Sequence, residues 1–329
     1  MNKLTIAVDC LGGDLGAEAV VNGAVMAAQA FPNINLVLVG PESEISGLFD
    51  TALKNNNSTA YKNRFKILHA PDVIHPSESP TLAFRRKKES SIVVGLKYVK
   101  EGNANGFVSA GSTGALLTGA TVTIGRQKGI ERPALGTLLP TPKGFTLLMD
   151  SGANMDAKPS YLLQFAQLGA DYMTRCMGIK NPRIGLINVG AEEEKGNAAA
   201  KEAHLLLKAS DLNFVGNIEG REIPTGAIDV AVCDGFTGNV ILKFMEGFAK
   251  TMLGTIKEEL MATTVSKMGA LMAKGAFGRV KKRFDYREVG GAPFLGLKNI
   301  VIKAHGSSDA LAIKNAVKQC VIFENQNSI

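Results

Sequence analysis

Six stretches of this 329-residue chain combine Gly with Ser, Thr, Asn or Asp directly after apolar, strand-like runs. They hold most of the residues that could do chemistry. Gly lets backbone N–H groups approach a ligand, and a helix that follows such a loop adds partial positive charge, so these loops suit phosphate or another anion. In a parallel α/β sheet they meet at the carboxyl edge, where ligands bind. The stretches are 9–14, 109–114, 150–154, 190–197, 234–239 and 305–309.

The stretch 109–114, SAGSTG, leads into a predicted helix N-terminus. We expect phosphate to be bound mainly by its backbone N–H groups and hydroxyls. Gly12, Gly13, Thr237 and His305 are expected to help. The full set of expected phosphate- or substrate-binding residues is Asp9, Gly12, Gly13, Asp14, Ser109, Gly111, Ser112, Thr113, Gly114, Asn154, Thr237, His305 and Ser307.

Charged residues in two of these stretches could take part in chemistry. Lys195 stands beside Gly196, where a cation can hold phosphate or polarise a carbonyl oxygen; a surface role is the alternative. The three acids at 192–194 are interpreted as a solvated helix N-terminus, with a metal site as the alternative. His305 follows a predicted strand and could act as a hydrogen-bond donor or base, whereas the other histidines lie in a connection or on a helix.

Motifs that define several other enzyme classes are absent from the sequence. There is no GxGxxG fingerprint and no Gly-Lys dipeptide, which argues against a dinucleotide-dependent dehydrogenase and a P-loop kinase. There is also no HExxH, no Cys/His cluster and no GxSxG elbow. We therefore expect an enzyme that uses no metal and no cofactor.

The overall charge favours an acidic partner or substrate, since 37 Lys and Arg residues stand against 30 Asp and Glu, a formal net charge of +7. The basic runs 85–88 and 279–283 could dock an acidic protein; nucleic acid is not expected, because neither run alternates with aromatic residues. The four cysteines are far apart in the sequence. The apolar run at the N-terminus ends at the charged residue Asp9 and is too short for a secretory signal. These features indicate a cytoplasmic protein with reduced thiols and no membrane span.

Short β-branched runs alternate with helix-like stretches along most of the chain, which is typical of an α/β fold with a large, mostly parallel sheet. Strands are predicted at 4–8, 36–39, 65–69, 107–109, 145–149, 183–188, 230–233 and 300–303. Helices are predicted at 17–31, 43–53, 90–101, 160–177, 198–209 and 308–321. We expect a single catalytic domain over residues 1–329, in one lobe or two.

Residues 240–286 interrupt this alternation with a long helical pattern that is rich in Met and ends in cations. The i, i+3, i+4 spacing of one helix face is followed by Ile241, Phe244, Met245, Phe248, Met252, Ile256 and Leu260. We expect the first half of this projecting segment to contact a second subunit. Residues 262–278 contain three glycines and are predicted to form a flexible apolar tip, which the following cations could hold against an anionic membrane surface.

Longer motifs run in order along the chain: DCLGGD from Asp9, RRKK from Arg85, SAGSTGALL from Ser109, GIERPALGTLLPT from Gly129, DSGANMDAKP from Asp150, NVGAEEEKGN from Asn188, VCDGFTGNV from Val232 and GLKNIVIKAHGSSD from Gly296. Together they resemble the bacterial acyl-ACP:phosphate acyltransferase family of phospholipid synthesis, over essentially the whole chain. The chain departs from the family pattern at Cys10-Leu11, where the family usually has Ala-Met, at Ser112 in place of Asn, and at Ser151 in place of Val.

The resemblance implies a three-layer α/β/α sandwich, like that of isopropylmalate dehydrogenase and phosphotransacetylase, in a homodimer. It also implies transfer of a fatty acyl group from acyl carrier protein to inorganic phosphate, which gives acyl phosphate and free carrier protein. Lys195 and Asn239 match the family's catalytic residues. The acyl phosphate would pass to a membrane glycerol-3-phosphate acyltransferase, which fits a cytoplasmic enzyme with peripheral membrane association.

A thioester is already activated, so this reaction needs no covalent nucleophile, metal or redox cofactor. The enzyme has to hold phosphate near the carbonyl carbon and stabilise the oxyanion as it forms. Two other reactions remain as alternatives: phosphate acetyl transfer from a coenzyme A thioester, and nucleophilic hydrolysis by Ser112 or Ser151 with His305. A structural or interaction protein is a further alternative, against which the six polar glycine loops argue.

Overall fold

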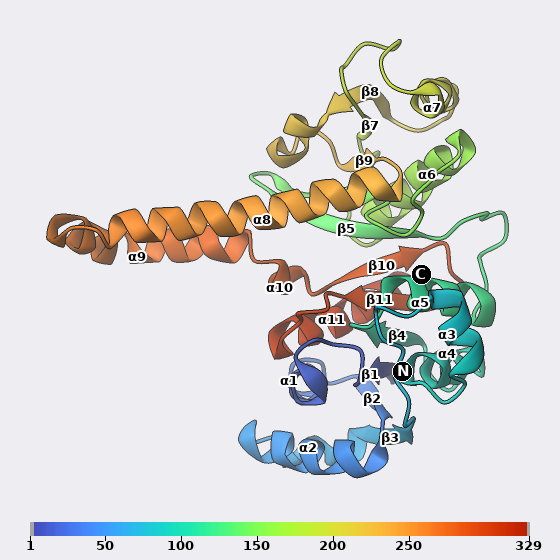
Figure 1. Ribbon diagram of the computed structural model, residues 1–329, viewed down its shortest axis with the longest axis vertical. Helices are drawn as coiled ribbons and strands as arrows, with labels where there is room; N and C mark the ends of the chain where they lie inside the picture. Colours follow the sequence, from blue (N-terminus) through green and yellow to red (C-terminus); the bar gives the residue numbers. More distant parts are fainter. Residues whose placement is uncertain (1–2, 328–329) are drawn as a thin grey trace.

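The computed structural model describes residues 3–327, and within them a sheet of eleven strands forms the framework of the protein (Figure 1). The strands lie in the order β3-β2-β1-β4-β11-β10-β5-β6-β9-β7-β8. They are β1 Leu4–Asp9, β2 Ile34–Gly40, β3 Phe65–His69, β4 Gly106–Ser109, β5 Ala134–Thr141, β6 Gly144–Met149, β7 Ile184–Asn188, β8 Phe214–Glu219, β9 Val230–Val232, β10 Gly291–Leu295 and β11 Ile300–Ala304.

Helices cover both faces of this sheet, and most neighbouring strands are parallel, so the predicted α/β fold is confirmed. The α-helices are α1 Gly16–Ala30, α2 Glu42–Asn55, α3 Pro80–Arg86, α4 Ser91–Lys100, α5 Thr113–Thr123, α6 Pro159–Arg175, α7 Ala198–Lys208, α8 Gly235–Leu260, α9 Thr264–Arg283, α10 Tyr286–Val289 and α11 Ala310–Asn327. Two 3-10 helices, η1 Thr59–Arg64 and η2 Gly220–Thr225, complete the described elements.

The first half of the sheet consists of the parallel strands β3, β2, β1, β4 and β11. Helices α1, α2 and α11 pack on one face, and α3, α4 and α5 on the other. Because both faces are covered, these strands are nearly continuous runs of Val, Ile and Leu. The close contact of α1 with α11 depends on Gly23, where an added Cβ would lie 2.6 Å from Cβ of Ile313.

The second half consists of the parallel strands β6, β9, β7 and β8. Helices α6 and α7 pack on one face, and η2 with the first turns of α8 on the other. Strands β10 and β5 connect the two halves and are antiparallel to their neighbours. Because each antiparallel pairing reverses the direction, the two parallel groups run in opposite directions.

This reversal corrects the expectation that all six glycine stretches share one edge of the sheet. Three of them follow β1, β4 and β11, and the other three follow β6, β7 and β9. Sheets twist by about 20–25° per strand, and five steps separate β4 from β9. Over five steps this twist amounts to about 100–125°, and it partly cancels the reversal of strand direction. The carboxyl ends of the two parallel groups therefore point in directions that differ by about 55–80°. Twist therefore turns the two groups of loops toward each other.

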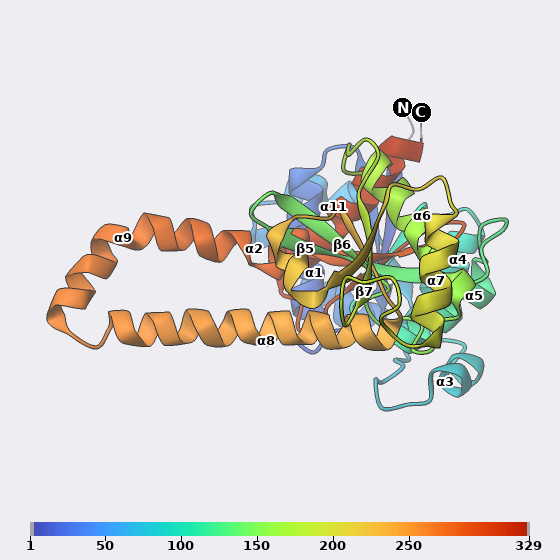
Figure 2. The same cartoon turned by 90° about the horizontal axis from the view of Figure 1, so that it is seen from above.

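Helices α8 and α9 form an arm that extends away from the sheet (Figures 1 and 2). The predicted apolar face of α8 is divided: Ile241 and Met245 pack with Leu242 against the second half. A stripe of large apolar side chains at intervals of four residues is exposed. We call this stripe the outer face of α8, and it consists of Phe236, Val240, Phe244, Phe248, Met252 and Ile256.

The tip of the arm is more regular than predicted, because α9 continues as a helix through the three glycines at 269, 275 and 278. Each glycine in a helix interior costs only about 1 kcal/mol. The start of α9 is stabilised by a capping box in which Thr263 and Ser266 bond each other's backbone N–H groups. Glycine spacing alone therefore does not break this helix.

All eight predicted strands and all six predicted helices are present, although α11 extends to Asn327. The sequence analysis missed β5, β8 and β10, which contain Pro140, Gly216 and Pro293 respectively. It also missed α3 and treated 234–239 as a loop, whereas α8 already begins at Gly235. The four cysteines are free, and three of them are buried.

Candidate active site

The loops after β1, β4 and β11 lie against one another at the end of the first half. An added Cβ at Gly12 would lie 2.5 Å from the Cα and N atoms of Gly111, so only glycine permits this approach of the two backbones. On the other side, Asp14 N donates a hydrogen bond to Gly306 O at 2.8 Å. The structure thus brings together three of the six predicted loops.

Asp9 lies beneath these loops and joins two of them. Its buried carboxylate accepts hydrogen bonds from Ser109 Oγ at 2.6 Å and from Leu11 N at 3.0 Å. Gly111 N donates to the same Ser109 hydroxyl at 3.0 Å. Burial raises the pKa of Asp9, although these hydrogen bonds act in the opposite direction. Asp9 and Ser109, both predicted as binding residues, therefore hold the loops from below and are not at the surface.

Helix α5 begins inside the predicted phosphate loop, at Thr113. Ser112 is its N-cap, and the Ser112 hydroxyl accepts a hydrogen bond from Ala115 N at 3.4 Å. The first N–H groups of a helix have no partner within it, so those of Thr113 and Gly114 are suited to bind an anion. An added Cβ at Gly114 would lie 2.7 Å from Cγ of Pro80, which places α3 beside this loop.

His305 and Ser307 follow β11 and are exposed. His305 Nδ1 lies 2.8 Å from Ser307 Oγ, and His305 Nε2 lies 3.8 Å from Glu246 Oε2 on α8. Because α8 begins in the second half, the Glu246 contact connects the two groups of loops. Lys303, which the sequence analysis did not select, also reaches the first group, since its Nζ donates to Ala110 O at 3.2 Å.

Asp150 organises the loop after β6, and the sequence analysis did not select it either. Its carboxylate accepts hydrogen bonds from the backbone N–H groups of Leu135, Gly152, Ala153 and Asn154, at 2.7–3.2 Å. Burial raises the pKa of Asp150, while these bonds act in the opposite direction. The signal that could have identified it is its position as the first polar residue after a buried strand.

Asn154 has a supporting position in this loop. Its Nδ2 donates to Asp150 Oδ2 at 2.8 Å and to Pro133 O at 2.9 Å, which uses both side-chain N–H donors. The backbone carbonyl oxygen of Asn154 accepts a hydrogen bond from Gly235 N at 2.7 Å. Asn154 therefore joins the loop after β6 to the start of α8, and its amide N–H groups are directed at the protein.

Thr237 and Asn239 lie in the first turns of α8 and are half-buried. Asp234 is the N-cap of this helix and accepts a hydrogen bond from Thr237 N at 2.7 Å. The Asn239 carboxamide lies over Gly152, where an added Cβ would be 3.6 Å from Asn239 Oδ1. The helix can approach so closely because a Cβ at Gly238 would collide with the backbone after β6.

Lys195 lies in a turn after β7, the strand that pairs with β9. Asn188 Nδ2 donates to Lys195 O at 3.0 Å, and Asn217 Nδ2 donates to Glu192 O at 2.7 Å, so the turn is held at the strand end. The Lys195 side chain is exposed. Lys195 and Asn239 thus follow adjacent parallel strands, at the same edge of the second half.

The acids at 192–194 differ in position from the prediction. Helix α7 begins at Ala198 with Asn197 as its N-cap, so the acids precede the helix and do not form its first turn. Glu193 Oε1 lies 2.6 Å from Lys208 Nζ. Within residues 3–327, no group of three or more His, Cys, Asp or Glu side chains is placed to hold a metal ion.

The two serines of the hydrolase alternative have structural roles. Ser151 is buried, its Oγ lies 2.6 Å from Thr137 Oγ1, and it donates to Leu135 O at 3.1 Å. Ser112 caps α5. These bonds argue against either hydroxyl as a nucleophile.

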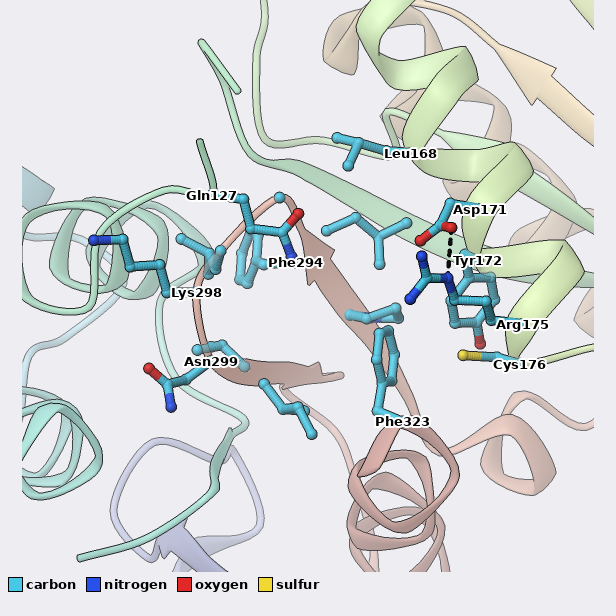
Figure 3. A pocket seen from close by; sticks show the side chains of 16 residues that line it. Gln127, Leu168, Asp171, Tyr172, Arg175, Cys176, Phe294, Lys298, Asn299 and Phe323 are labelled. Atoms are coloured by element: carbon cyan, nitrogen blue, oxygen red, sulfur yellow. Dashed lines mark hydrogen bonds and ion pairs between the residues drawn. The ribbon is translucent and has the colours of Figure 1, made fainter. Parts of the chain in front are cut away.

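A pocket elsewhere in the protein contains none of the predicted site residues (Figure 3). It lies between α6, the turn from β10 to β11, and α11, and its lining includes Tyr172, Lys298 and Phe323. An ion pair of 2.6 Å between Arg175 and Asp171 lies at its side. This pocket is at the opposite end of β11 from His305.

Known proteins resemble this chain over nearly its whole length. The family model described as "Fatty acid synthesis protein" matches residues 4–329. The "Phosphate acyltransferase" of Clostridium botulinum (strain Loch Maree / Type A3) is 49% identical over 327 residues, which cover 99% of this chain and 96% of the relative. That of Clostridium acetobutylicum is 49% identical over 318 residues, which cover 97% and 94%.

Solved structures with the same arrangement are more distant in sequence. A phosphotransacetylase from Streptococcus pyogenes has a TM-score of 0.62 at 18% identity, covering 98% of this chain and 94% of its own. A branched-chain phosphotransacylase from Enterococcus faecalis V583 has a TM-score of 0.57 at 14% identity, covering 97% and 98%. At such low identity the likeness shows a common fold.

Proposed function

Because this chain belongs to the phosphate acyltransferase family of fatty acid synthesis proteins, we propose that it transfers a fatty acyl group from acyl carrier protein to inorganic phosphate. A phosphate oxygen attacks the thioester carbonyl carbon, the new C–O bond forms and the C–S bond breaks. The products are acyl phosphate and the free thiol of the carrier protein. The observation that carries this proposal is the start of α5, which directly follows the loop after β4 where that loop contacts the loop after β1.

The two groups of loops suit the two reacting partners. We assign phosphate to the first group, where the N–H groups of Thr113 and Gly114 are unpaired within α5, with help from Gly12, Gly13, Thr237 and His305. We assign the thioester carbonyl to Lys195 and Asn239, which follow adjacent strands of the second half. Positioning of reactants can account for about 7–11 kcal/mol of a barrier. One oxyanion donor contributes about 2.7–4 kcal/mol.

The proposal is tested by supplying the purified protein with phosphate and a long-chain acyl thioester of either acyl carrier protein or coenzyme A. We expect acyl phosphate from the carrier-protein thioester, at a higher kcat/KM than from the coenzyme A thioester. Preference for the coenzyme A thioester would overturn the carrier-protein proposal and favour the alternative in which a coenzyme A thioester is the donor. An acyl-enzyme detected by mass spectrometry would instead favour a nucleophilic hydrolase.

We also propose a homodimer in which the outer face of α8 is covered by a second copy of the chain. Phe244 and Phe248 are 68% and 56% exposed, and their rings stack with centroids 5.8 Å apart. Monomeric proteins rarely expose apolar patches of several hundred Å². The support is that the exposed side chains Val240, Phe244, Phe248 and Met252 follow one another along successive turns and stay within about 120° around the helix axis.

For the tip of the arm we propose reversible binding to an anionic membrane surface, from which acyl phosphate could reach a membrane glycerol-3-phosphate acyltransferase. The large apolar side chains exposed there are Met261, Val265, Met268, Leu271 and Met272. Exposed Lys267, Lys274 and Arg279 lie on the same helix. Each cation near an anionic surface adds about 1 kcal/mol. None of the helices described is both long and apolar enough to cross a bilayer.

A further inference from the structure

Lys303 occupies the end of β11, next to the loops of the first half. In the parallel ladder between β11 and β4 it pairs with Ser109, whose hydroxyl donates to Asp9 on the next strand. Side chains paired across a ladder extend to the same face of a sheet. The Lys303 ammonium group donates to the carbonyl oxygens of Ala110, at 3.2 Å, and Ala304. It therefore reaches the loop to which we assign phosphate.

Lys303 is a partly buried cation with charged neighbours of both signs. Its side chain is half-buried, and burial lowers the pKa of Lys303 to about 8. Asp9 and Asp14 raise this pKa, whereas Lys243 on α8 lowers it further. An ammonium group has three N–H donors, and the two carbonyl oxygens accept two of them. In the described part of the chain Lys303 makes no salt bridge, because the Asp9 carboxylate is bonded to Ser109 and the backbone.

We propose that Lys303 binds the phosphate substrate and holds it against the start of α5. A phosphate oxygen would accept the third N–H donor and place a negative charge in direct contact with this half-buried cation. The inference rests on the proposed function and deepens it, because it divides the work of two lysines. Lys303 holds phosphate from the first half, and Lys195 with Asn239 acts on the thioester carbonyl from the second.

Variants at Lys303 test this assignment by their effect on phosphate affinity. Lys303→Met removes the charge and keeps the length of the side chain. A hydrogen bond to a charged group is worth about 1.5–3 kcal/mol, so we expect the KM for phosphate to rise about 10- to 150-fold. The KM for acyl carrier protein should remain within about twofold. Lys303→Arg should restore most of the phosphate affinity, because a cation is again present.

Lys298→Met is the matched control. Lys298 is exposed and lies before β11, at the pocket of Figure 3, so this variant makes the same change of charge at the other end of the strand. Its kinetic constants should equal those of the wild type. A purely structural Lys303, which only ties β4 to β11, predicts another result: the melting temperature and both KM values would change together in Lys303→Met, with no selective effect on phosphate.

The pH dependence gives a second readout. Phosphate binds the charged form of Lys303, so its KM in the wild type should rise as the pH passes about 8. In Lys303→Arg this rise should be absent, because Arg stays charged over the accessible range. The charged groups that face Lys303, namely Asp9, Asp14 and Lys243, are unchanged in both proteins. The same rise in both proteins would overturn the assignment.

Direct binding separates this inference from the proposed reaction. Isothermal titration of inorganic phosphate into the folded protein, without any acyl donor, should show binding to the wild type that is lost in Lys303→Met. This result would support the inference even if no thioester gave acyl phosphate. Wild-type phosphate affinity in folded Lys303→Met would overturn it even if acyl transfer were observed. Lys303→Gln, which keeps N–H donors without the charge, replaces the Met variant if that protein does not fold.

Discussion

The most direct test of the site's architecture is Gly12→Ala. Gly12 lies where the loops after β1 and β4 touch, and an added Cβ would be 2.5 Å from backbone atoms of Gly111 and 2.8 Å from Asp9 Oδ2. These atoms cannot move aside easily. Those of Gly111 belong to the backbone, and the Asp9 carboxylate is held by hydrogen bonds from Ser109 and Leu11. The two loops therefore have to separate when the methyl group is added.

The size of this movement follows from the contact distance. Carbon atoms in ordinary contact are about 3.5–4.0 Å apart, so a contact of 2.5 Å requires a shift of roughly 1 Å. Overpacking of this kind destabilises a protein by about 1–3 kcal/mol. A displacement of about 1 Å in positioning groups can cost about 10²-fold in rate. We expect Gly12→Ala to lose about 10²-fold in kcat/KM and to remain folded.

The assay is acyl phosphate formation measured beside thermal melting. Gly47→Ala is the control, because Gly47 lies in α2 and an added Cβ there meets nothing within 4 Å. This control should keep full activity and gain about 0.5–1 kcal/mol of stability, as Ala replaces Gly within a helix. Wild-type kcat/KM in Gly12→Ala would refute the reasoning that these loops must touch for catalysis.

Four further predictions concern the chemistry and the arm. Lys195→Ala and Asn239→Ala should each lose about 10²–10³-fold in kcat without a change in melting temperature; near-wild-type turnover in a folded variant would remove that residue from the mechanism. A chelator should leave acyl phosphate formation unchanged, and a strict requirement for a divalent ion would return the acids at 192–194 to consideration. Sedimentation analysis should show the proposed dimer for the wild type and a monomer for Phe244→Glu, and an unchanged mass would contradict a dimer contact on the outer face of α8. Replacing Leu271 and Met272 by Glu should abolish co-sedimentation with anionic vesicles while the dimer and activity in solution persist; unchanged sedimentation would exclude the membrane role of the tip.

Local patterns in the sequence predicted most of the sheet, because buried parallel strands are apolar runs and turns are marked by Gly and polar residues. The strands that escaped prediction, β5, β8 and β10, contain Pro or Gly and depend on pairing with their neighbours. Strands β5 and β10 also pair with each other, although they lie far apart in the sequence. Strand formation there depends on cross-strand neighbours more than on local preference. The prediction from local patterns therefore omitted β5 and β10, the antiparallel strands that set the direction of the second half.

The direction of the second half decides which glycine stretches lie together. With an all-parallel sheet, six glycine stretches would share one edge, whereas β10 and β5 reverse the second half. The loops stay predicted as chemistry-bearing segments, but their grouping into two sets of three depends on strand direction, which no single loop encodes. The contact of His305 with Glu246 connects the two sets of loops. It forms because α8 begins in the second half and is long enough to bring Glu246 to the loop after β11.

Asp150 and Lys303 show what residue type and spacing cannot reveal about this site. Each is an ordinary charged residue at a strand end, and each differs from its exposed counterparts through burial, which shifts the pKa of the carboxyl group upward and that of the ammonium group downward. Asp150 is compensated by backbone N–H groups and therefore fixes a loop. Lys303 donates to two carbonyl oxygens, which leaves one of its three N–H donors for a ligand. The difference between the supporting role of Asp150 and the ligand-binding role that we propose for Lys303 thus lies in hydrogen-bonding capacity. The fold fills the acceptor positions of the Asp150 carboxylate, whereas it leaves one donor of Lys303 for the substrate.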